Sequence, residues 1–516
     1  MNNKNKFVGA VKAVLESEEN ATFTQNGMEA YKSSLDPFVD LIFKGPGCRD
    51  NDTTMEDLVT KAFEVNPDYT LKLLFYLRDI RGGKVGQGER KIFRTGLRKF
   101  VTLAGEDKVI NSGFVELIPE YGRWDDLFCL FDISDKFDKY IILIISRQLI
   151  KDIEAYTNKE YSKISLLAKW LPSHKTGSKK SKLAKKIYRT IGFTEKMYRT
   201  ILTNLRREIK ILETYLSNKD YSFDYSKLPS QAKAKHSSEN GVFLRNDKER
   251  YTKFIEDAAA GRVKTNVNTL YPYQIIRSVR CLSRYSSYFK VQETQLETDW
   301  KSLPDYVETT RSFIPVIDTS GSMYCGQDLL PIDTAVGVGL YLAERNKGIF
   351  KNTYITFSSS PSLVEVDASK SLKDRVELTT INCANTDFVK VFELILNAAI
   401  KHNLSNEDLP EAVVVISDMQ FDAANNSSYS SNKVLEVVNT MFNNKGYTAP
   451  KLIFWNAQQV GTQVSPVTIN DAGVVLMSGC KPGMIDLCLK ATRLQDTVED
   501  IVNHDRYRQI RYVEKV

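Results

Sequence analysis

Between about residues 50 and 100, apolar side chains recur every three or four residues, which is the spacing of α-helices. Residues 53–56 match a capping box at a helix start, and the apolar positions that follow run to Phe63 before Pro67 ends the helix. Further helices are predicted over 68–78 and 90–100. Short helices joined by short turns predict an all-α region, either a helical-repeat (HEAT- or solenoid-like) array or a bundle, although no strict repeat is present.

From residue 311 the pattern changes to short apolar runs that alternate with helical stretches. The predicted strands are 313–317, 353–357, 412–416, 451–455 and 473–477, and the predicted helices are 332–345, 387–402, 431–443 and 484–490. This alternation predicts a doubly wound, parallel α/β sheet. Such sheets bind ligands at the carboxyl ends of their strands, where Asp318 and Asp418 fall.

The charge distribution follows the same division of the chain. Of 516 residues, 42% are hydrophobic and 26% are charged, which is ordinary for a globular, multidomain protein. Residues 1–300 carry 51 Lys and Arg against 39 Asp and Glu, a net charge of +12, whereas residues 301–516 carry 20 against 25, a net charge of −5. We therefore predict a basic α-helical domain over 1–300 and an acidic α/β domain over 301–516.

Several classes of protein are excluded by composition. The longest apolar run, residues 140–145, is far shorter than the roughly 18–20 residues that span a bilayer, and no secretory signal sequence is evident. The seven cysteines form no CxxC pair and the four histidines are far apart, so neither a disulfide framework nor a zinc ribbon is indicated. We expect a cytoplasmic protein (host cytoplasm if it is viral) with no membrane partner.

Two basic segments are candidates for binding nucleic acid. No acidic residue occurs from Ser162 to Thr194, where residues 172–178 are predicted to form a loop that is followed by a basic helix. The second segment places its arginines at helical spacings of three and four, so we expect them to share one helical face, near aromatic side chains. The candidates are Lys175, Lys179, Lys180, Lys182, Lys185, Lys186, Arg189, Arg277, Arg280 and Arg284. Cationic groups neutralise phosphates and aromatic rings stack on unpaired bases, so RNA is the predicted partner. The alternative is a solvated basic face that only aids solubility.

One loop carries a specific metal-binding pattern. Asp318, Ser320 and Ser322 alternate on a tight turn, so that one carboxylate and two hydroxyls can converge on a hard divalent cation. Asp418 can add a second carboxylate, and Thr386 a third hydroxyl. Mg²⁺ is the expected ion, with Mn²⁺ or Ca²⁺ as alternatives. Mg²⁺ keeps water-filled positions, so it could accept an acidic group from a protein partner.

This pattern closely resembles the metal-ion-dependent adhesion site of von Willebrand factor A domains, over about residues 308–516. The resemblance assigns the DxSxS motif to Asp318, Ser320 and Ser322, the later threonine to Thr386 and the strand-end aspartate to Asp418. The sequence departs from the family where Asn385 replaces the usual glycine before the threonine. The alternative is a vestigial loop that no longer binds metal.

The N-terminal half carries a second resemblance, in residues 68–83, 88–90, 119–126 and 243–250. These segments look like a little-characterised family of plants, fungi, giant viruses and phages, which pairs a helical half with an A-like half. That architecture is similar to the TROVE-module Ro ribonucleoprotein, whose helical repeats form a ring that binds small and misfolded noncoding RNAs. Residues 123–126, within this resemblance, are expected to be structural ion-pair and packing residues.

Together these features predict a noncatalytic, Ro-like RNA-binding protein whose A domain holds a divalent cation for partner binding or stability. One alternative is a protein–protein scaffold that captures an acidic residue at the metal. The other is a metal-dependent phosphoesterase. Ser320 stands where a phosphotransferase loop needs its second carboxylate, and no phosphate-binding GxxxxGK[ST] loop is present, so we expect no enzyme activity.

Overall fold

The computed structural model of the protein describes residues 19–174, 178–326, 329–357, 360–380, 387–422, 433–457 and 464–512. The described residues up to about 300 are mostly helical, and the remainder of the described chain is built on a six-stranded sheet. Both parts of the prediction for the fold class, a helical N-terminal region and an α/β C-terminal region, are therefore confirmed at this level. No helix among the described residues combines the length and apolar character needed to cross a membrane.

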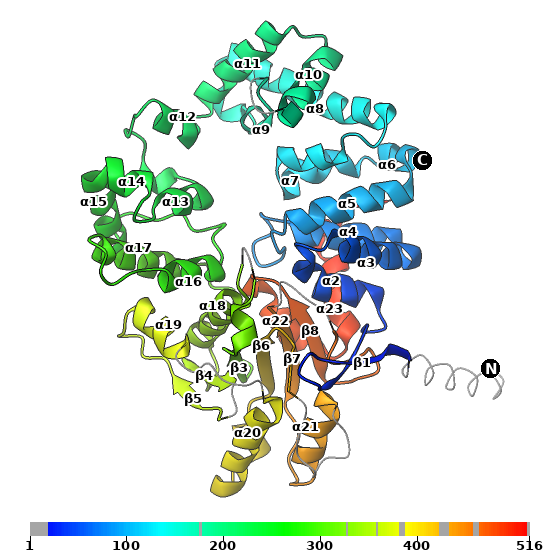
Figure 1. Cartoon of the computed structure of the whole chain (residues 1–516), viewed down its shortest axis with the longest axis vertical. Coiled ribbons are helices and arrows are strands. Elements are labelled where there is room, and N and C mark those ends of the chain that lie inside the picture. Colours follow the sequence, from blue (N-terminus) through cyan, green and yellow to red (C-terminus); the bar gives the residue numbers. More distant parts are fainter. Residues whose placement is uncertain are drawn as a thin grey trace, which may run out of the picture.

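The helices of the N-terminal region follow one another along an arc that leaves the α/β region and returns to it (Figure 1). On the outgoing arm lie α2 (Pro37–Lys44), α3 (Asp52–Val65), α4 (Pro67–Arg78), α5 (Lys91–Ala104), α6 (Glu106–Ser112) and α7 (Ile118–Tyr121). The far end holds α8 (Asp135–Thr157), α9 (Leu167–Trp170), α10 (Ser178–Ile191) and α11 (Glu195–Glu208). The returning arm is α12 (Leu212–Ser217), α13 (Ser230–His236), α14 (Val242–Asn246), α15 (Lys248–Ala259), α16 (Pro272–Arg280) and α17 (Phe289–Lys301).

Asparagine side chains begin two of the predicted helices. The Asn51 side chain accepts a hydrogen bond from the backbone N–H of Thr54, so α3 begins before the capping box that we predicted at residues 53–56. Asn66 caps α4 in the same way, with Pro67 at its first position. An uncharged amide caps as well as a hydroxyl, which is why the position of the true cap was missed.

The sheet has the strand order β5-β4-β3-β6-β7-β8. Its strands are β3 (Phe313–Asp318), β4 (Thr353–Phe357), β5 (Leu363–Glu365), β6 (Ala412–Ser417), β7 (Lys451–Asn456) and β8 (Val474–Ser478). All neighbouring strands run parallel except the edge strand β5, which pairs antiparallel with β4. The first strand of the sheet, β3, lies near its centre. The next strands, β4 and β5, follow on one side of it, and β6, β7 and β8 follow on the other, which places a topological switch between β3 and β6.

Helices cover both faces of this sheet, as a doubly wound fold requires. The helix α18 (Pro331–Arg345) packs closely on one face, because a methyl group at Gly339 would lie 2.4 Å from Cγ1 of Ile317. On the other face Phe388 of α20 (Phe388–His402) stacks with Phe454 of β7. The pairing Val316↔Val415 and Val415↔Phe454 puts Phe454 on the opposite face from Ile317. The remaining helices are α19 (Leu372–Thr380), α21 (Val434–Asn443), α22 (Ile485–Lys490) and α23 (Leu494–Asn503).

One hydrophobic core extends through both regions of the chain, from Met28 to Ile510. The N-terminal hairpin β1 (Ala21–Phe23) and β2 (Glu29–Tyr31) lies against the α/β region, where Tyr31 and Ser465 exchange two backbone hydrogen bonds of 2.8 Å. A second, smaller core between residues 212 and 255 holds the returning arm together and is mostly aromatic. The main core therefore includes both the outgoing arm and the far end of the arc, and it also includes α16, whereas the first part of the returning arm has a core of its own.

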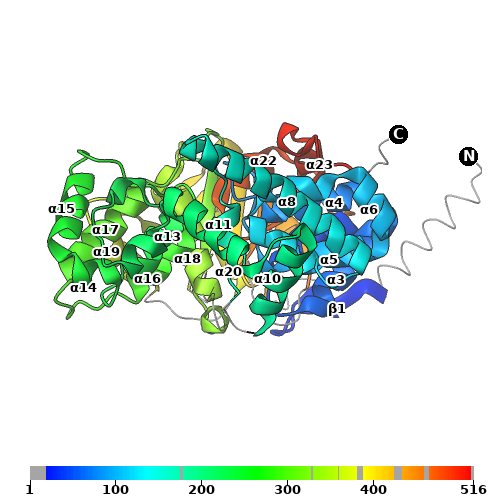
Figure 2. The same cartoon turned by 90° about the horizontal axis from the view of Figure 1, so that it is seen from above.

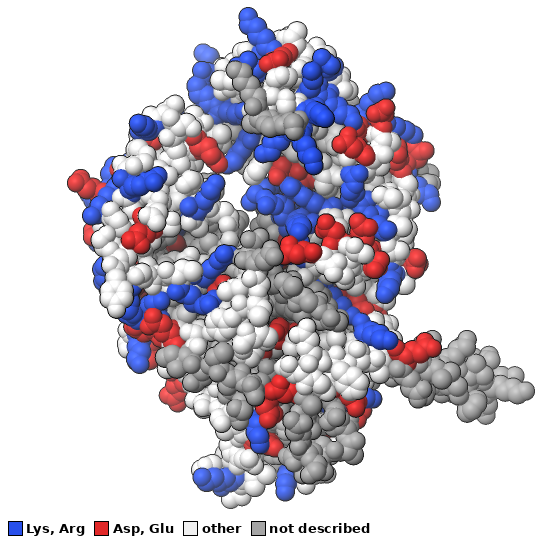
Figure 3. Space-filling view, in the orientation of Figure 1, with Lys and Arg blue, Asp and Glu red and all other residues white. Residues whose placement is uncertain are grey.

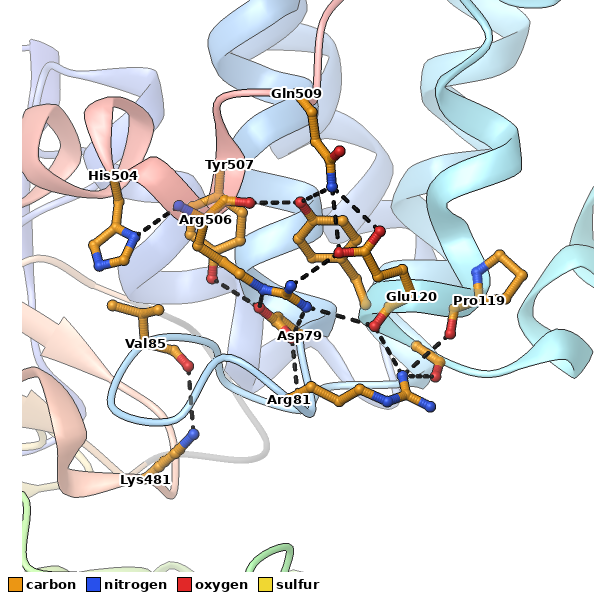
Figure 4. Close-up of polar contacts among 12 residues, drawn as sticks. Asp79, Arg81, Val85, Pro119, Glu120, Lys481, His504, Arg506, Tyr507 and Gln509 are labelled. Atoms are coloured by element: carbon orange, nitrogen blue, oxygen red, sulfur yellow. Dashed lines mark hydrogen bonds and ion pairs between the residues drawn. The ribbon is translucent and has the colours of Figure 1, made fainter. Parts of the chain in front are cut away.

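The C-terminal turn after α23 binds the outgoing arm through hydrogen bonds and ion pairs (Figure 4). Nε of Arg506 donates to Oδ2 of Asp79 over 2.9 Å, and its Nη1 lies 3.0 Å from Oε1 of Glu120. The guanidinium also lies 4.2 Å from the ring centroid of Tyr121, which stacks on the buried ring of Tyr507. Because Asp79 is completely buried, Arg506 supplies the countercharge that this carboxylate needs.

Lys481 is buried at the same junction, and it predicts a measurable pH dependence of stability. Its ammonium donates a hydrogen bond of 3.3 Å to the carbonyl of Val85, and burial lowers the pKa of Lys481 to about 8. Between pH 8 and the unfolded pKa of about 10.4, the unfolded chain binds more protons, so this group makes stability rise with pH. Lys481→Met is therefore expected to stabilise the protein at pH 7 by about 1–3 kcal/mol. In urea unfolding at pH 7 and pH 10, an equal gain at both values would contradict this assignment.

Candidate functional site

The predicted metal loop lies at the carboxyl ends of two adjacent parallel strands. Asp318 ends β3, Asp418 directly follows β6, and the register Ile317↔Ile416 places the two ends side by side. Oδ1 of Asp318 accepts the backbone N–H of Ser320 over 2.9 Å, and the hydroxyls of Ser320 and Ser322 are 3.1 Å apart. The structure therefore brings together four of the five predicted ligands. Thr386, the fifth, lies outside the described residues.

Two buried carboxylates with little countercharge dominate the electrostatics of this loop. Burial, followed by repulsion from Asp418, raises the pKa of Asp318 to about 7. Burial also raises the pKa of Asp418, against hydrogen bonds from Ser322 and the backbone of Gln420. The hydroxyl of Ser417 donates to Oδ2 of Asp318 over 2.5 Å. The carboxylates and serine hydroxyls that we predict as metal ligands all offer hard oxygen atoms, and such a set of donors suits Mg²⁺.

The loop has few charged ligands. Among the residues that the structure describes, no group of three or more His, Cys, Asp or Glu side chains is arranged to hold a metal ion. Any cation at this site would rely on Asp318 and Asp418 for charge, and on hydroxyls and water for its other ligands. The next residue, Met419, has a φ of 63°, an uncommon left-handed conformation for a side chain of this size.

The basic helix predicted after the 172–178 segment is α10. Ala184, Ile187 and Tyr188 form its buried side. Its exposed cations are Lys179, Lys180, Lys182, Lys185 and Arg189, and none of them has an ion pair within the described part of the chain. Lys186 differs from them, because it contacts the buried carboxylate of Asp138 and so has a structural partner. Lys175 lies outside the described residues.

The second predicted basic segment faces the α/β region instead. The helix α16 ends at Arg280, so our prediction of one helical face for all three arginines is wrong for Arg284, which follows the helix end. Arg280 contacts the buried Asp333 of α18. Nη2 of Arg284 lies 2.7 Å from Asp374 and 2.5 Å from Glu377 of α19. Arg277 lies in the electrostatic field of Asp333. These arginines therefore connect the returning arm to the α/β region.

Residues 123–126 contribute to a network of charged side chains, as predicted. Oδ2 of Asp126 accepts Nε of Arg78 over 2.7 Å, and its Oδ1 accepts Nε of Arg94 over 2.7 Å. Nη2 of Arg94 also donates to Asp125 over 2.6 Å. Gly122 permits this packing, since a Cβ there would lie 2.4 Å from Oδ2 of Asp126. The two aspartates are thus confirmed as structural ion-pair residues.

Arg123 has a different role from its neighbours and was missed as a candidate. Its Cζ lies 5.0 Å from the ring centroid of Trp170, and it has no carboxylate within ion-pair distance among the described residues. Burial lowers the pKa of Arg123, and the nearby cations Arg78 and Arg90 lower it further, against the opposing effect of Asp125 and Asp126. Arg90 is exposed and also lacks an ion pair in the described structure. Sequence separations of 33 and 47 residues hide this cluster from motif analysis.

The basic side chains gather on one part of the surface. Figure 3 shows Lys and Arg concentrated on the helical arc around the opening between its two arms. Figure 2, from above, shows α10 and α11 on the arc between its two arms. The α/β region shows a more even mixture of charges in the same view (Figure 3). The charge asymmetry predicted from the sequence is thus visible as a positively charged helical arc.

Fold and site together define a class of protein: a helical arc rich in exposed cations, joined to a mostly parallel sheet that carries a polar loop at its switch point. Within the sequence, a domain of unknown function, DUF2828, matches residues 24–97 and 140–311. A second domain of unknown function, DUF7788, matches residues 312–515.

Individual proteins are also similar to this chain. The uncharacterized protein L728 of Acanthamoeba polyphaga mimivirus is 28% identical over 508 residues, which cover 92% of this chain and 85% of the relative. This giant-virus relative agrees with the resemblance predicted from the sequence. The crystal structure of the Deinococcus radiodurans RO (RSR) protein aligns with a TM-score of 0.36 and 10% identity, over 91% of this chain and 99% of that one.

Proposed function

We propose that the protein binds RNA through its helical arc and is a noncatalytic, ribonucleoprotein-like component. The observation that carries the proposal is the set of exposed cations on α10, which have no carboxylate partner among the described residues. Such charges repel one another, and a polyanion removes this repulsion while releasing its own counterions. The phosphate backbone of a nucleic acid is the polyanion that this spacing of cations suits.

Aromatic side chains on the same helical arc favour unpaired RNA over a duplex. Trp170 is half-buried beside Arg123 and Lys169, and Tyr161 is 41% exposed just before the basic segment. Rings in such positions can stack on splayed bases, whereas paired bases within a helix are inaccessible to them. We therefore propose single-stranded segments or loops of small, structured RNAs as the ligand.

The proposal is tested by titrating the full-length protein into a labelled single-stranded RNA at increasing salt. If about five phosphates are contacted, log K should fall with log salt at a slope of about −3 to −4. The same strand in a duplex should bind less tightly. Failure to bind single-stranded RNA at low salt, in protein shown to be folded, would refute the function.

We also propose that Asp318, Ser320, Ser322 and Asp418 hold a divalent cation, with Mg²⁺ preferred. The mutual repulsion of two buried carboxylates supports this proposal, since a cation would remove it. A bound ion would supply an open coordination position, and an acidic side chain of a partner protein is the ligand that such a position accepts. The A-domain relationship itself stays a prediction.

Mg²⁺ is expected to stabilise the wild-type protein against urea by about 1–3 kcal/mol at ion concentrations 10–100-fold above its dissociation constant. Asp318→Asn should remove this response, because the buried carboxylate supplies half of the charge at the site. Asp367→Asn, a charge-matched change at an exposed turn, should retain it. Equal stabilisation of all three proteins would show that Mg²⁺ acts elsewhere.

A further inference from the structure

We propose that Arg90 and Arg123, beside Trp170, form a dedicated site for a phosphate group of single-stranded RNA. This inference rests on the proposed function and locates a specific contact outside the basic helix α10. It concerns the outgoing arm of the arc, where the sequence predicted structural residues at 123–126 and no role for Arg90.

The nearby carboxylates are already neutralised by other cations. Asp126 accepts from both Arg78 and Arg94, and Asp125 pairs with Arg94. Two negative charges thus balance two buried or half-buried guanidinium groups. Neither of the remaining two arginines, Arg90 and Arg123, lies within ion-pair distance of a carboxylate among the described residues, so the four arginines and two aspartates together carry an excess of two positive charges.

The position of the site is well determined by the surrounding structure. The backbone N–H of Arg123 donates to Asp126 over 2.8 Å, which holds the start of this turn against the ion-pair network. Across from it, Arg206 of α11 donates to the carbonyls of Ala168 and Leu171 over 2.8 and 2.7 Å. These bonds hold the short helix α9 that carries Trp170, and the indole ring in turn orients the guanidinium of Arg123.

A guanidinium presents only donors, in a planar fork that matches two phosphate oxygens. Two such groups without carboxylate partners therefore select a doubly accepting anion over a neutral or cationic ligand. The helices α9 and α10 both pack on α11, so a single strand that lies across α11 could contact this site and the lysines of α10 together. This continuity favours an RNA backbone phosphate over a free phosphate ion.

The test compares three variants of the full-length protein, each checked by circular dichroism and thermal melting. Arg90→Gln with Arg123→Gln removes the site, and Lys139→Gln with Lys151→Gln removes the same charge from exposed positions of α8. Arg123→Lys keeps the positive charge and loses the planar fork of N–H donors that a guanidinium provides. The probes are a fluorescein-labelled single-stranded RNA, read by anisotropy across a salt series, and inorganic pyrophosphate, read by the shift in melting temperature.

The double arginine variant is expected to bind RNA about tenfold more weakly or worse, with a salt slope smaller by about 1. The lysine control should stay within about twofold of wild type, and Arg123→Lys should lose affinity with its slope retained. Unchanged RNA affinity in the double arginine variant would overturn the inference and leave the proposed function intact. A third outcome is that wild type binds no RNA, while pyrophosphate stabilises wild type but not the double arginine variant. That result would refute RNA as the ligand of the protein and of this site, and it would show that the site binds another phosphate compound.

Discussion

Reversal of four charges on α10 is expected to weaken the binding of single-stranded RNA by about 10²–10³-fold at moderate salt. The variant carries Lys179→Glu, Lys180→Glu, Lys182→Glu and Lys185→Glu. All four side chains are exposed and have no ion pair among the described residues, so the change leaves the packing of the helix intact. Four phosphate contacts are lost and replaced by repulsion, and the salt slope should shrink by about 3. Anisotropy titrations across a salt series measure both quantities.

The matched control reverses four exposed lysines of the α/β region: Lys351, Lys370, Lys401 and Lys445. It changes the net charge of the protein by the same amount, and it should retain RNA affinity within a few-fold. If both variants lose affinity equally, the overall charge of the protein governs binding and α10 is not the site. If neither loses affinity, the helix makes no contact with RNA.

Arg506→Ala is expected to lower the free energy of unfolding by about 3 kcal/mol, at the lower end of the range for breaking a buried ion pair. Asp79 is completely buried, and the other hydrogen bonds that it accepts among the described residues come from the backbone N–H of Arg81 and the hydroxyl of Tyr507, which place no positive charge in contact with it. The variant also loses the contact of the guanidinium with the ring of Tyr121. Urea unfolding followed by circular dichroism measures the change.

Two further variants separate burial from charge at this turn. Arg508→Ala breaks an ion pair with Asp505 that is 74% and 82% exposed, and it should cost at most about 1 kcal/mol. Asp79→Asn in the Arg506→Ala background should recover part of the lost stability, since it removes the uncompensated charge. A loss below about 1 kcal/mol for Arg506→Ala would mean that water or rearrangement neutralises Asp79.

Most element positions follow from local patterns of apolar residues. The strand predicted over 353–357 coincides with β4, and those predicted from 313, 412 and 451 are one residue shorter than the observed strands. The strand predicted over 473–477 is shifted by one residue from β8. Central strands of a parallel sheet are buried on both faces, so they appear as unbroken apolar runs. The edge strand β5 is largely exposed and has only three residues, so it carries no such signal and was missed.

The predicted metal loop was accessible from sequence because its ligands cluster within five residues and at a strand end. Asp318, Ser320 and Ser322 need only a tight turn to approach one another, and Asp418 joins them once β3 and β6 are neighbours. By contrast, the caps and the ends of helices depend on single hydrogen bonds. The end of α16 at Arg280 is one such helix end. Because the helix stops there, Arg284 does not lie on the helical face that we predicted for it.

The sequence by itself therefore determined the helical and α/β halves, the charge difference between them and the polar loop at a strand end. Only the tertiary structure decided which cations are free for a ligand. Arg280, Arg284 and Lys186 look equivalent to their neighbours in the sequence, yet each meets a carboxylate at least 48 residues away. Arg90 and Arg123 meet none within the described chain. Helical and strand periodicities are local properties, whereas the neutralisation of a charge depends on which distant segments the folded core brings within a few ångströms.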